Sequence, residues 1–147
     1  MVDRDHEAPK KRVLFICCHN AARSQMAEAL LNARYGERFR AFSAGTEPSE
    51  AIDPLAMEAM REIGIDMSKQ RTKSVDELIR IQAVFDYVVT VCPKARMTCP
   101  YFPAPEQVHV GFDDPEDLEG SEEERMALMR KVRDDIGEWI DRFFGSR

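Results

Sequence analysis

The chain of 147 residues is long enough for one domain with a sizeable core, and its 44% hydrophobic and 33% charged residues are typical of a soluble globular protein. Its formal net charge of -6 argues against binding to nucleic acid or to an anionic membrane surface. No apolar run approaches the roughly 20 residues that a membrane span requires.

The N-terminal residues carry charges of both signs and no apolar segment, unlike a secretory signal. We therefore expect a cytoplasmic protein. Residues 1–11 are predicted to be a flexible tail, and residues 12–147 a single domain.

The first half of the chain alternates strand patterns with helix patterns. Residues 12–17, which contain the apolar run at 13–16, predict a buried strand, and residues 24–35 predict an amphipathic helix with Ser24 as its N-cap. Residues 39–43 alternate apolar and polar side chains, as a strand does. Asp53 precedes a proline and is expected to cap the next helix.

The second half continues the alternation. Residues 74–81 begin with a capping box and predict a helix, whereas residues 85–91 predict a strand buried on both faces. Residues 93–106 contain four prolines and are predicted to be a long loop. A last strand over residues 107–112 leads, through an acidic run, to a C-terminal helix that starts with a second capping box at residue 121.

Strands that alternate with helices predict a three-layer α/β sandwich around a mainly parallel four-stranded sheet. Ligands of such folds bind beyond the carboxyl ends of the strands. Cys17 ends the first predicted strand, Cys92 follows the third, and Asp114 follows the fourth. These side chains are therefore expected at one edge of the sheet.

The junction between the first strand and the first helix is typical of an anion-binding loop. The loop consists of Cys17, Cys18, His19, Asn20, Ala21, Ala22, Arg23 and Ser24. Backbone N–H groups at a helix N-terminus and an arginine fork suit a tetrahedral oxyanion. For Cys17 to be mainly thiolate at neutral pH, its pKa must fall by about two units, or roughly 2.7 kcal/mol. A helix dipole supplies only about 0.3–1 kcal/mol, so Arg23, the loop amides and the Ser24 hydroxyl are expected to supply the rest.

Three further cysteines need a role, since disulfides are rare in a reducing cytosol. Cys18 directly follows the strand and is typical of a small buried apolar residue. Six residues separate Cys92 from Cys99, and a disulfide between them would require the intervening segment to fold back or move. The alternatives are two inert thiols or, with His109, half of a metal site.

Several segments resemble known proteins. The chain resembles the low-molecular-weight protein tyrosine phosphatases, which share one fold, in two motifs. The first is Cys17 followed by five residues, Arg23 and Ser24, and the second is Asp114-Pro115 late in the chain. Four segments are similar, more narrowly, to the thioredoxin-coupled arsenate reductases that use this fold. They are RSQMAE at 23–28, FSAG at 42–45, VVTVC at 88–92 and GFDDP at 111–115. The resemblance extends from about residue 13 into the C-terminal helix.

The resemblance implies a role for each conspicuous side chain. Cys17 attacks arsenate that is bound by the loop amides and Arg23, and Asp114 is the general acid for the departing oxygen. Cys92 then attacks Cys17 and releases arsenite. Cys99 attacks Cys92 in turn, and thioredoxin reduces the resulting Cys92–Cys99 disulfide.

The resemblance also covers the residues around the loop. It implies that Asn20 holds the loop shape and that Ser24 stabilises the thiolate. Some relatives bind potassium beside the loop, and Asn20, Glu28 and Ser43 match three of those ligands, although the acidic fourth has no clear match. Ala22 stands where many relatives carry another cysteine. No other metal and no organic cofactor is expected.

Other interpretations remain open. A phosphatase would use Cys17, Arg23 and Asp114 but has no need of Cys92 or Cys99, and a non-catalytic oxyanion-binding protein has no need of a thiol relay. Asp113 competes with Asp114 for the role of the acid, and His19 is either a second anion donor or a solvent-facing residue. Glutaredoxin or a small thiol could replace thioredoxin as the reductant. A monomer is expected because no exposed apolar surface is evident.

Overall fold

The computed structural model describes residues 9–92 and 102–147. The elements are β1 (Lys11–Cys17), α1 (Arg23–Tyr35), β2 (Phe39–Gly45), α2 (Pro54–Arg61), α3 (Val75–Arg80), β3 (Tyr87–Thr90), β4 (Glu106–His109) and α5 (Glu122–Phe144). The predicted strands and helices are all present, with ends that differ by up to a few residues. Most of the predicted tail and most of the predicted long loop, with Cys99, lie outside the described residues.

The sheet has the strand order β2-β1-β3-β4, and all three neighbouring pairs are parallel. This arrangement confirms the predicted sheet. Residues 13–16 of the central strand β1 are fully buried, as expected for a strand that is covered on both faces. Ile16 pairs with Ala44 on one side and with Thr90 on the other, so the ends of β1, β2 and β3 lie side by side.

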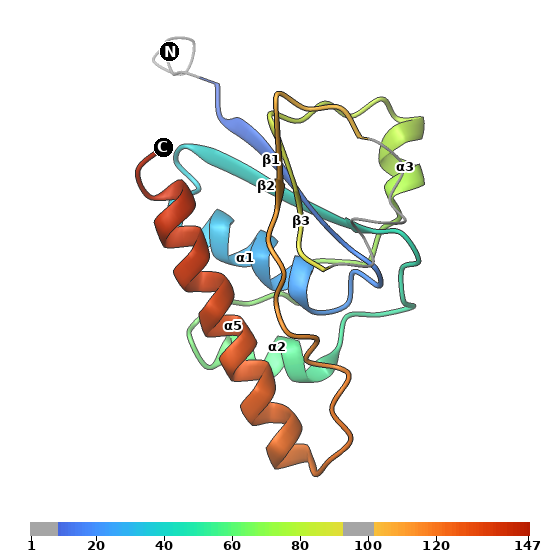
Figure 1. Ribbon diagram of the computed structural model, residues 1–147, viewed down its shortest axis with the longest axis vertical. Coiled ribbons are helices and arrows are strands. Elements are labelled where there is room, and N and C mark those ends of the chain that lie inside the picture. The colour runs from blue at the N-terminus through green and yellow to red at the C-terminus, as the bar shows by residue number, and fades with distance from the viewer. Residues whose placement is uncertain (1–8, 93–101) are drawn as a thin grey trace.

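The helices form the outer layers. In Figure 1, α1 and α5 lie against each other on one side of the sheet, α2 extends this layer along α5, and α3 lies on the opposite side. The C-terminal end of α5 is fixed by aromatic contacts, since the ring of Phe144 lies 5.0 Å from that of Phe39 and 5.5 Å from that of Tyr87. The predicted three-layer sandwich is confirmed.

The predicted helix caps have mixed outcomes. Asp53 caps α2, because its Oδ1 accepts a hydrogen bond from the N–H of Leu55 at 2.8 Å. Ser121 and Glu124 form the complete capping box of α5. At α3 the Ser74 hydroxyl accepts from the N–H of Glu77, but the Glu77 carboxylate pairs with an arginine instead of completing the box.

The assignment of Ser24 as the N-cap of α1 is wrong. The cap position is Ala22, which makes no side-chain capping bond, and Ser24 lies inside the first turn with its side chain fully buried. Its hydroxyl contacts Cys17 Sγ rather than a backbone amide of the helix. Ser24 is therefore a residue of the first helical turn whose side chain contacts the Cys17 loop and does not cap the helix.

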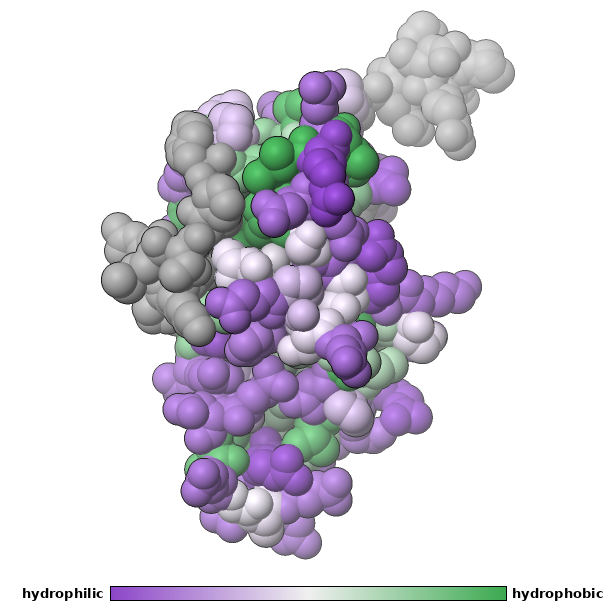
Figure 2. Space-filling view, turned by 90° about the vertical axis from the view of Figure 1, so that its right-hand side faces the viewer, coloured by the Kyte–Doolittle hydropathy of each residue, from purple (hydrophilic) through white to green (hydrophobic). Residues whose placement is uncertain are grey.

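The surface departs from the sequence-based expectation in one respect. The face of the molecule in Figure 2 is mostly hydrophilic but carries an apolar patch in its upper part. Ile79, Ile81 and Val84 are 43%, 72% and 72% exposed, so the expectation of no exposed apolar surface is wrong. The monomeric state stays a prediction. Within the described part of the chain, no helix has the length and apolar character that crossing a membrane requires.

Candidate active site

The loop between β1 and α1 is held from outside through its carbonyl groups. Each carbonyl oxygen of residues 17–21 accepts a hydrogen bond from a donor outside that segment. The donors are, in order, the N–H groups of Thr46, Glu47 and Ser49, the Nε2 of Gln25 and the N–H of Asp53, at 3.2, 2.8, 2.9, 3.0 and 3.0 Å. In a planar trans peptide the C=O and the next N–H point in opposite directions. The N–H groups of residues 18–22 therefore face the inside of the loop, which makes an anion cradle.

Two positions allow the loop to close this tightly. Asn20 adopts the left-handed region with φ of 53°, which asparagine tolerates better than most residues. Gly45, at the end of β2, lies directly beside the loop. A Cβ on Gly45 would lie 2.7 Å from the carbonyl oxygen of Cys18 and 2.9 Å from the Cβ of Asn20. The sequence analysis did not single out Gly45.

A directed chain of hydrogen bonds ends at the Cys17 sulfur. The Asn20 Oδ1 accepts from the backbone N–H of Lys73 and from the Nε2 of Gln25, both at 2.9 Å. The Asn20 Nδ2 consequently faces Ser24 and donates to its Oγ at 2.8 Å. This leaves the Ser24 hydroxyl hydrogen for Cys17 Sγ, also at 2.8 Å. The geometry agrees with the roles expected for Asn20 and Ser24 and adds Gln25 and Lys73, which sequence reasoning missed.

The pKa of Cys17 is shifted in the direction opposite to the expected one. Burial raises the pKa of the Cys17 thiol, and the proximity of the Cys92 thiol acts in the same direction. The Ser24 hydroxyl and the backbone N–H groups of Ser24 and Asn20 lower this pKa but only partly compensate. The Arg23 guanidinium instead contacts the carbonyl oxygen of Phe112 and faces Asp114. Burial therefore opposes the expected lowering of the Cys17 pKa.

Arg23 connects the loop to the segment that follows β4. Its Nη1 donates to the carbonyl oxygen of Phe112 at 3.0 Å, and its Nη2 lies 3.6 Å from Asp114 Oδ2. Asp113 instead turns outward to Lys131, at 3.5 Å. Of the two candidate acids, the structure thus brings Asp114 to the rim of the loop.

A further carboxyl group lies at this rim. Glu116 is an exposed residue, and its carboxyl group hydrogen-bonds to that of Asp53. Partial burial of this carboxyl, the hydrogen bond and the negative charges of Asp53 and Asp114 raise the pKa of Glu116 to about 7, although Arg23 opposes the shift. Sequence reasoning missed Glu116, because a glutamate within an acidic run carries no signal that would single it out.

The structure brings Cys92 to Cys17. Cys92 follows β3, the neighbour of β1, where the N–H of Val91 donates to the carbonyl oxygen of Ile16 at 2.9 Å, and both cysteines are only 2–3% exposed. Cys18 is 4% exposed and belongs to the hydrophobic core, in agreement with its interpretation as a small apolar residue. His19 is exposed, with its Nδ1 3.2 Å from the carbonyl oxygen of Glu47, which favours the solvent-facing interpretation.

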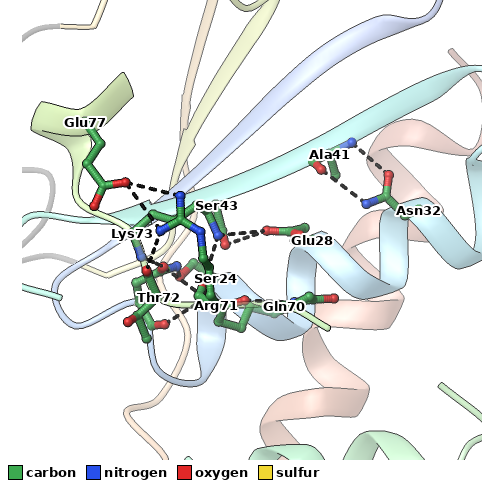
Figure 3. Close-up of polar contacts among 12 residues, drawn as sticks. Ser24, Glu28, Asn32, Ala41, Ser43, Gln70, Arg71, Thr72, Lys73 and Glu77 are labelled. Atoms are coloured by element: carbon green, nitrogen blue, oxygen red, sulfur yellow. Dashed lines mark hydrogen bonds and ion pairs between the residues drawn. The ribbon is translucent and has the colours of Figure 1, made fainter. Parts of the chain in front are cut away.

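Two of the three residues that match potassium ligands, Glu28 and Ser43, lie together with Lys73, whose backbone N–H bonds to the third, Asn20. Figure 3 shows Glu28 of α1 directed toward Ser43 of β2 and toward Lys73. The Ser43 hydroxyl donates to Glu28 Oε1 at 2.6 Å, and Lys73 Nζ lies 3.8 Å from the same oxygen. The ammonium group already supplies the positive charge, so these residues do not fit a potassium ion. Among residues 9–92 and 102–147, no group of three or more His, Cys, Asp or Glu side chains could hold a metal ion.

Glu28 and Lys73 are both strongly affected by burial. Burial raises the pKa of Glu28, opposed mainly by the positive charge of Lys73 and the hydroxyl of Ser43. Burial likewise lowers the pKa of Lys73, opposed by the charge of Glu28. Each charge is therefore tolerated in this position because the other is present.

Known proteins resemble the chain over nearly its whole length. Residues 12–146 match the family model of the low molecular weight phosphotyrosine protein phosphatases. The chain is 44% identical over 135 residues to an arsenate reductase of Halalkalibacterium halodurans, covering 91% of this chain and 95% of the relative. It is 40% identical over 134 residues to an arsenate reductase of Bacillus subtilis, covering 90% and 94%.

Solved structures of similar fold agree with these sequence matches. A thioredoxin-dependent arsenate reductase from Corynebacterium glutamicum is similar with a TM-score of 0.66 and 30% identity, over 99% of this chain and 67% of that one. A low molecular weight protein tyrosine phosphatase from T. tengcongensis, 24% identical, shows the same fold with a TM-score of 0.76 over 94% of this chain and 100% of the other. The chain therefore belongs to the low molecular weight phosphotyrosine protein phosphatase family and, within it, to the arsenate reductases.

Proposed function

We propose that this protein reduces arsenate to arsenite, with Cys17 as the nucleophile and thioredoxin as the reductant. The observation that carries the proposal is the second thiol. Cys17 lies at the base of a cradle of inward-facing amides, and Cys92 lies beside it. A hydrolytic phosphatase has no use for Cys92, whereas reduction of an oxyanion without a cofactor needs two electrons from a pair of thiols.

The first step joins Cys17 to arsenic. The loop amides and the Arg23 guanidinium bind the oxygens of the hydrogen arsenate dianion. Cys17 Sγ attacks arsenic, an S–As bond forms, and the As–OH bond breaks. The proton of the Cys17 thiol leaves with the departing hydroxyl as water, which balances the step. Asp114 at the rim of the loop passes this proton, and the Ser24 hydroxyl stabilises the negative charge that develops on sulfur.

The second step is the reduction itself. Cys92 attacks Cys17 Sγ, the S–S bond forms as the S–As bond breaks, and the proton of the Cys92 thiol passes to the departing arsenite. Arsenic keeps the electron pair of that bond, passes from As(V) to As(III), and leaves as arsenite. Two thiols are oxidised to one disulfide, so the electrons balance.

The third step carries the disulfide outward. Cys17 and Cys92 are both buried, so a protein reductant has poor access to a disulfide between them. Attack of Cys99 on Cys92 regenerates the Cys17 thiol and leaves a Cys92–Cys99 disulfide for thioredoxin. A similar solved structure is that of a thioredoxin-dependent arsenate reductase, which supports this choice over glutaredoxin or a small thiol. The cycle needs reduced thiols, which the cytoplasm maintains, and it uses the cysteines of one chain. We therefore propose a cytoplasmic monomer.

Weak hydrolysis of small phosphate esters is a second candidate activity. The family match and the Arg23–Asp114 pair at the loop favour it, because arsenate and phosphate are both tetrahedral oxyanions. Transfer of a phosphoryl group to Cys17 uses the same cradle and the same acid. Only the relay through Cys92 separates the two reactions.

The test is arsenate-dependent oxidation of NADPH, coupled through thioredoxin and thioredoxin reductase. The wild type is expected to turn over, and the variants Cys17→Ser, Cys92→Ser and Cys99→Ser are expected to lose turnover. Phosphate ester hydrolysis by the same variants provides the matched control, since it should be lost in Cys17→Ser but kept in Cys92→Ser. Arsenate turnover at the wild-type rate without Cys92 would contradict the relay.

A further inference from the structure

Glu28 is a buried acid directly behind the catalytic loop. It lies one helical turn after Ser24 in α1, and its side chain is only 14% exposed. A carboxylate in such a position is costly unless it is paired and hydrogen-bonded. The Ser43 hydroxyl supplies the hydrogen bond, and Lys73, 15% exposed, supplies the opposite charge at 3.8 Å.

Lys73 connects this pair to the loop through its own backbone. Its N–H donates to Asn20 Oδ1 at 2.9 Å, and its carbonyl oxygen accepts from the N–H of Gly45 at 2.8 Å. Its Nζ also donates to the carbonyl oxygen of Arg71 at 2.7 Å. The residue that neutralises Glu28 is thus the residue whose backbone fixes the orientation of the Asn20 amide.

The segment around Lys73 makes a second contact with the same network. Gln25 Nε2 donates to the carbonyl oxygen of Arg71 at 2.9 Å, and Gln70 Nε2 donates to Gln25 Oε1 at 2.8 Å. Figure 3 shows Gln70, Arg71 and Lys73 gathered on the side of the loop next to Ser24 and Glu28. Displacement of residues 70–73 would therefore disturb both donors to Asn20 Oδ1.

We infer that the Lys73 ammonium is a built-in cation that positions the Cys17 loop and makes it independent of any bound monovalent cation. By pairing with Glu28, Lys73 holds residues 70–73 against α1, and this segment orients Asn20, then Ser24, toward Cys17. Lys73 is thus a positioning residue, since its side chain acts through others. The kinetic part of this inference rests on the proposed arsenate reduction.

A tethered ammonium has two physical advantages over a free ion. It carries the same single positive charge, and it is delivered by the chain without the entropic cost of association. Because it is also a directed hydrogen-bond donor to the Arg71 carbonyl oxygen, it fixes the backbone of its own segment. Removal of the ammonium leaves Glu28 as an uncompensated buried charge.

The test compares Lys73→Ala and Lys73→Met with the wild type in potassium chloride and in tetramethylammonium chloride. The kcat/KM of the wild type for arsenate should differ by less than about twofold between the salts at equal ionic strength. In tetramethylammonium chloride both variants should lose on the order of tenfold in kcat/KM, because the loop is less well oriented. Potassium should restore the kcat/KM of Lys73→Ala, because this variant leaves space for the ion beside Glu28. It should not restore the kcat/KM of Lys73→Met, because the methionine side chain fills that space.

Arg142→Met is the matched control. Arg142 pairs with Glu138 on the exposed face of α5, with its side chain 70% exposed, so its loss should change neither the rate nor the salt response. Stimulation of the wild type by potassium, or wild-type behaviour of Lys73→Met, would overturn the inference.

A second readout does not depend on arsenate. The pH profile of Cys17 alkylation, resolved by peptide mass spectrometry, should shift to higher pH in Lys73→Ala and return in potassium chloride. If neither the wild type nor any variant reduces arsenate but the alkylation profile still shifts, the proposed function fails and the inference stands. If Lys73→Met does not fold, the double variant Lys73→Met, Glu28→Gln removes both buried charges, and a wild-type alkylation profile in this variant would contradict the inference.

Discussion

The carboxyl groups of Glu116 and Asp53 share a hydrogen bond, which joins the segment that carries Asp114 to the N-terminus of α2. Asp53 is in turn bonded to the catalytic loop, because its N–H donates to the carbonyl oxygen of Ala21. The bond requires one proton between the two carboxyl groups. The contact between the segment that follows β4 and the start of α2 is therefore linked to the protonation of Glu116.

This carboxyl pair predicts a pH dependence of stability. The pKa of Glu116 is raised to about 7 in the folded protein from an ordinary value of 4.5, so the folded state holds a proton that the unfolded state releases. Its contribution to stability is fully present below the lower value and is lost as the pH rises toward 7. Glu116→Gln keeps a hydrogen-bond donor for Asp53 but has no proton to lose. Between these pH values, the melting temperature should fall less steeply with rising pH in Glu116→Gln than in the wild type. Equal slopes would contradict the assignment of the raised pKa to Glu116.

Gly45→Ala should damage the loop. The added Cβ would lie 2.7 Å from the carbonyl oxygen of Cys18, and backbone on both sides cannot easily give way. We expect destabilisation of about 1–3 kcal/mol and a loss of arsenate turnover on the order of a hundredfold. Gly111→Ala is the control, because the nearest atom to its added Cβ is 4.0 Å away. Denaturant unfolding and steady-state kinetics measure both effects, and equal behaviour of the two variants would be incompatible with the close approach.

Ser24→Ala removes the hydroxyl that contacts Cys17 and leaves Asn20 Nδ2 without this acceptor. Since the hydroxyl lowers the pKa of Cys17, its loss should raise that pKa further. Alkylation of Cys17 should then require a higher pH, and the rate with arsenate should fall by about tenfold or more. An unchanged alkylation profile would show that Ser24 does not stabilise the thiolate.

Asp114→Asn and Asp113→Asn make a matched pair of neighbouring substitutions. Asp114 faces Arg23 at the loop, whereas Asp113 faces Lys131 at the surface. We expect the first to lower kcat for arsenate by roughly 10²- to 10⁴-fold, as for loss of a general acid, and the second to leave kcat nearly unchanged. A larger loss in Asp113→Asn would reverse the assignment of the acid.

The sequence predicts the local parts of this site well. The buried run over residues 13–16, the loop that follows it and the helix pattern after Arg23 are contiguous, so their order defines the anion cradle. The parallel sheet follows from strands buried on both faces, and with it the meeting of Cys17 and Cys92 at one sheet edge.

The features that sequence reasoning missed depend on distant contacts. Lys73 and Gly45 act on the loop from positions 53 and 25 residues beyond Asn20, and no local pattern marks them. Ser24 was misassigned because the rule for caps considers only neighbours within the helix, whereas its partner is at the end of a strand. The raised pKa of Cys17 is likewise invisible in the sequence, because the burial of its side chain appears only in three dimensions.

The most direct test of the relay is a single turnover without thioredoxin. Reduced protein is mixed with arsenate, and arsenite, free thiols and disulfide-linked peptides are measured on the same sample. The account predicts one arsenite released for every two thiols lost, a Cys92–Cys99 disulfide in the wild type, and a Cys17–Cys92 disulfide in Cys99→Ser. Arsenite formed by Cys92→Ser at the wild-type rate, or formed with no loss of thiols, would contradict it.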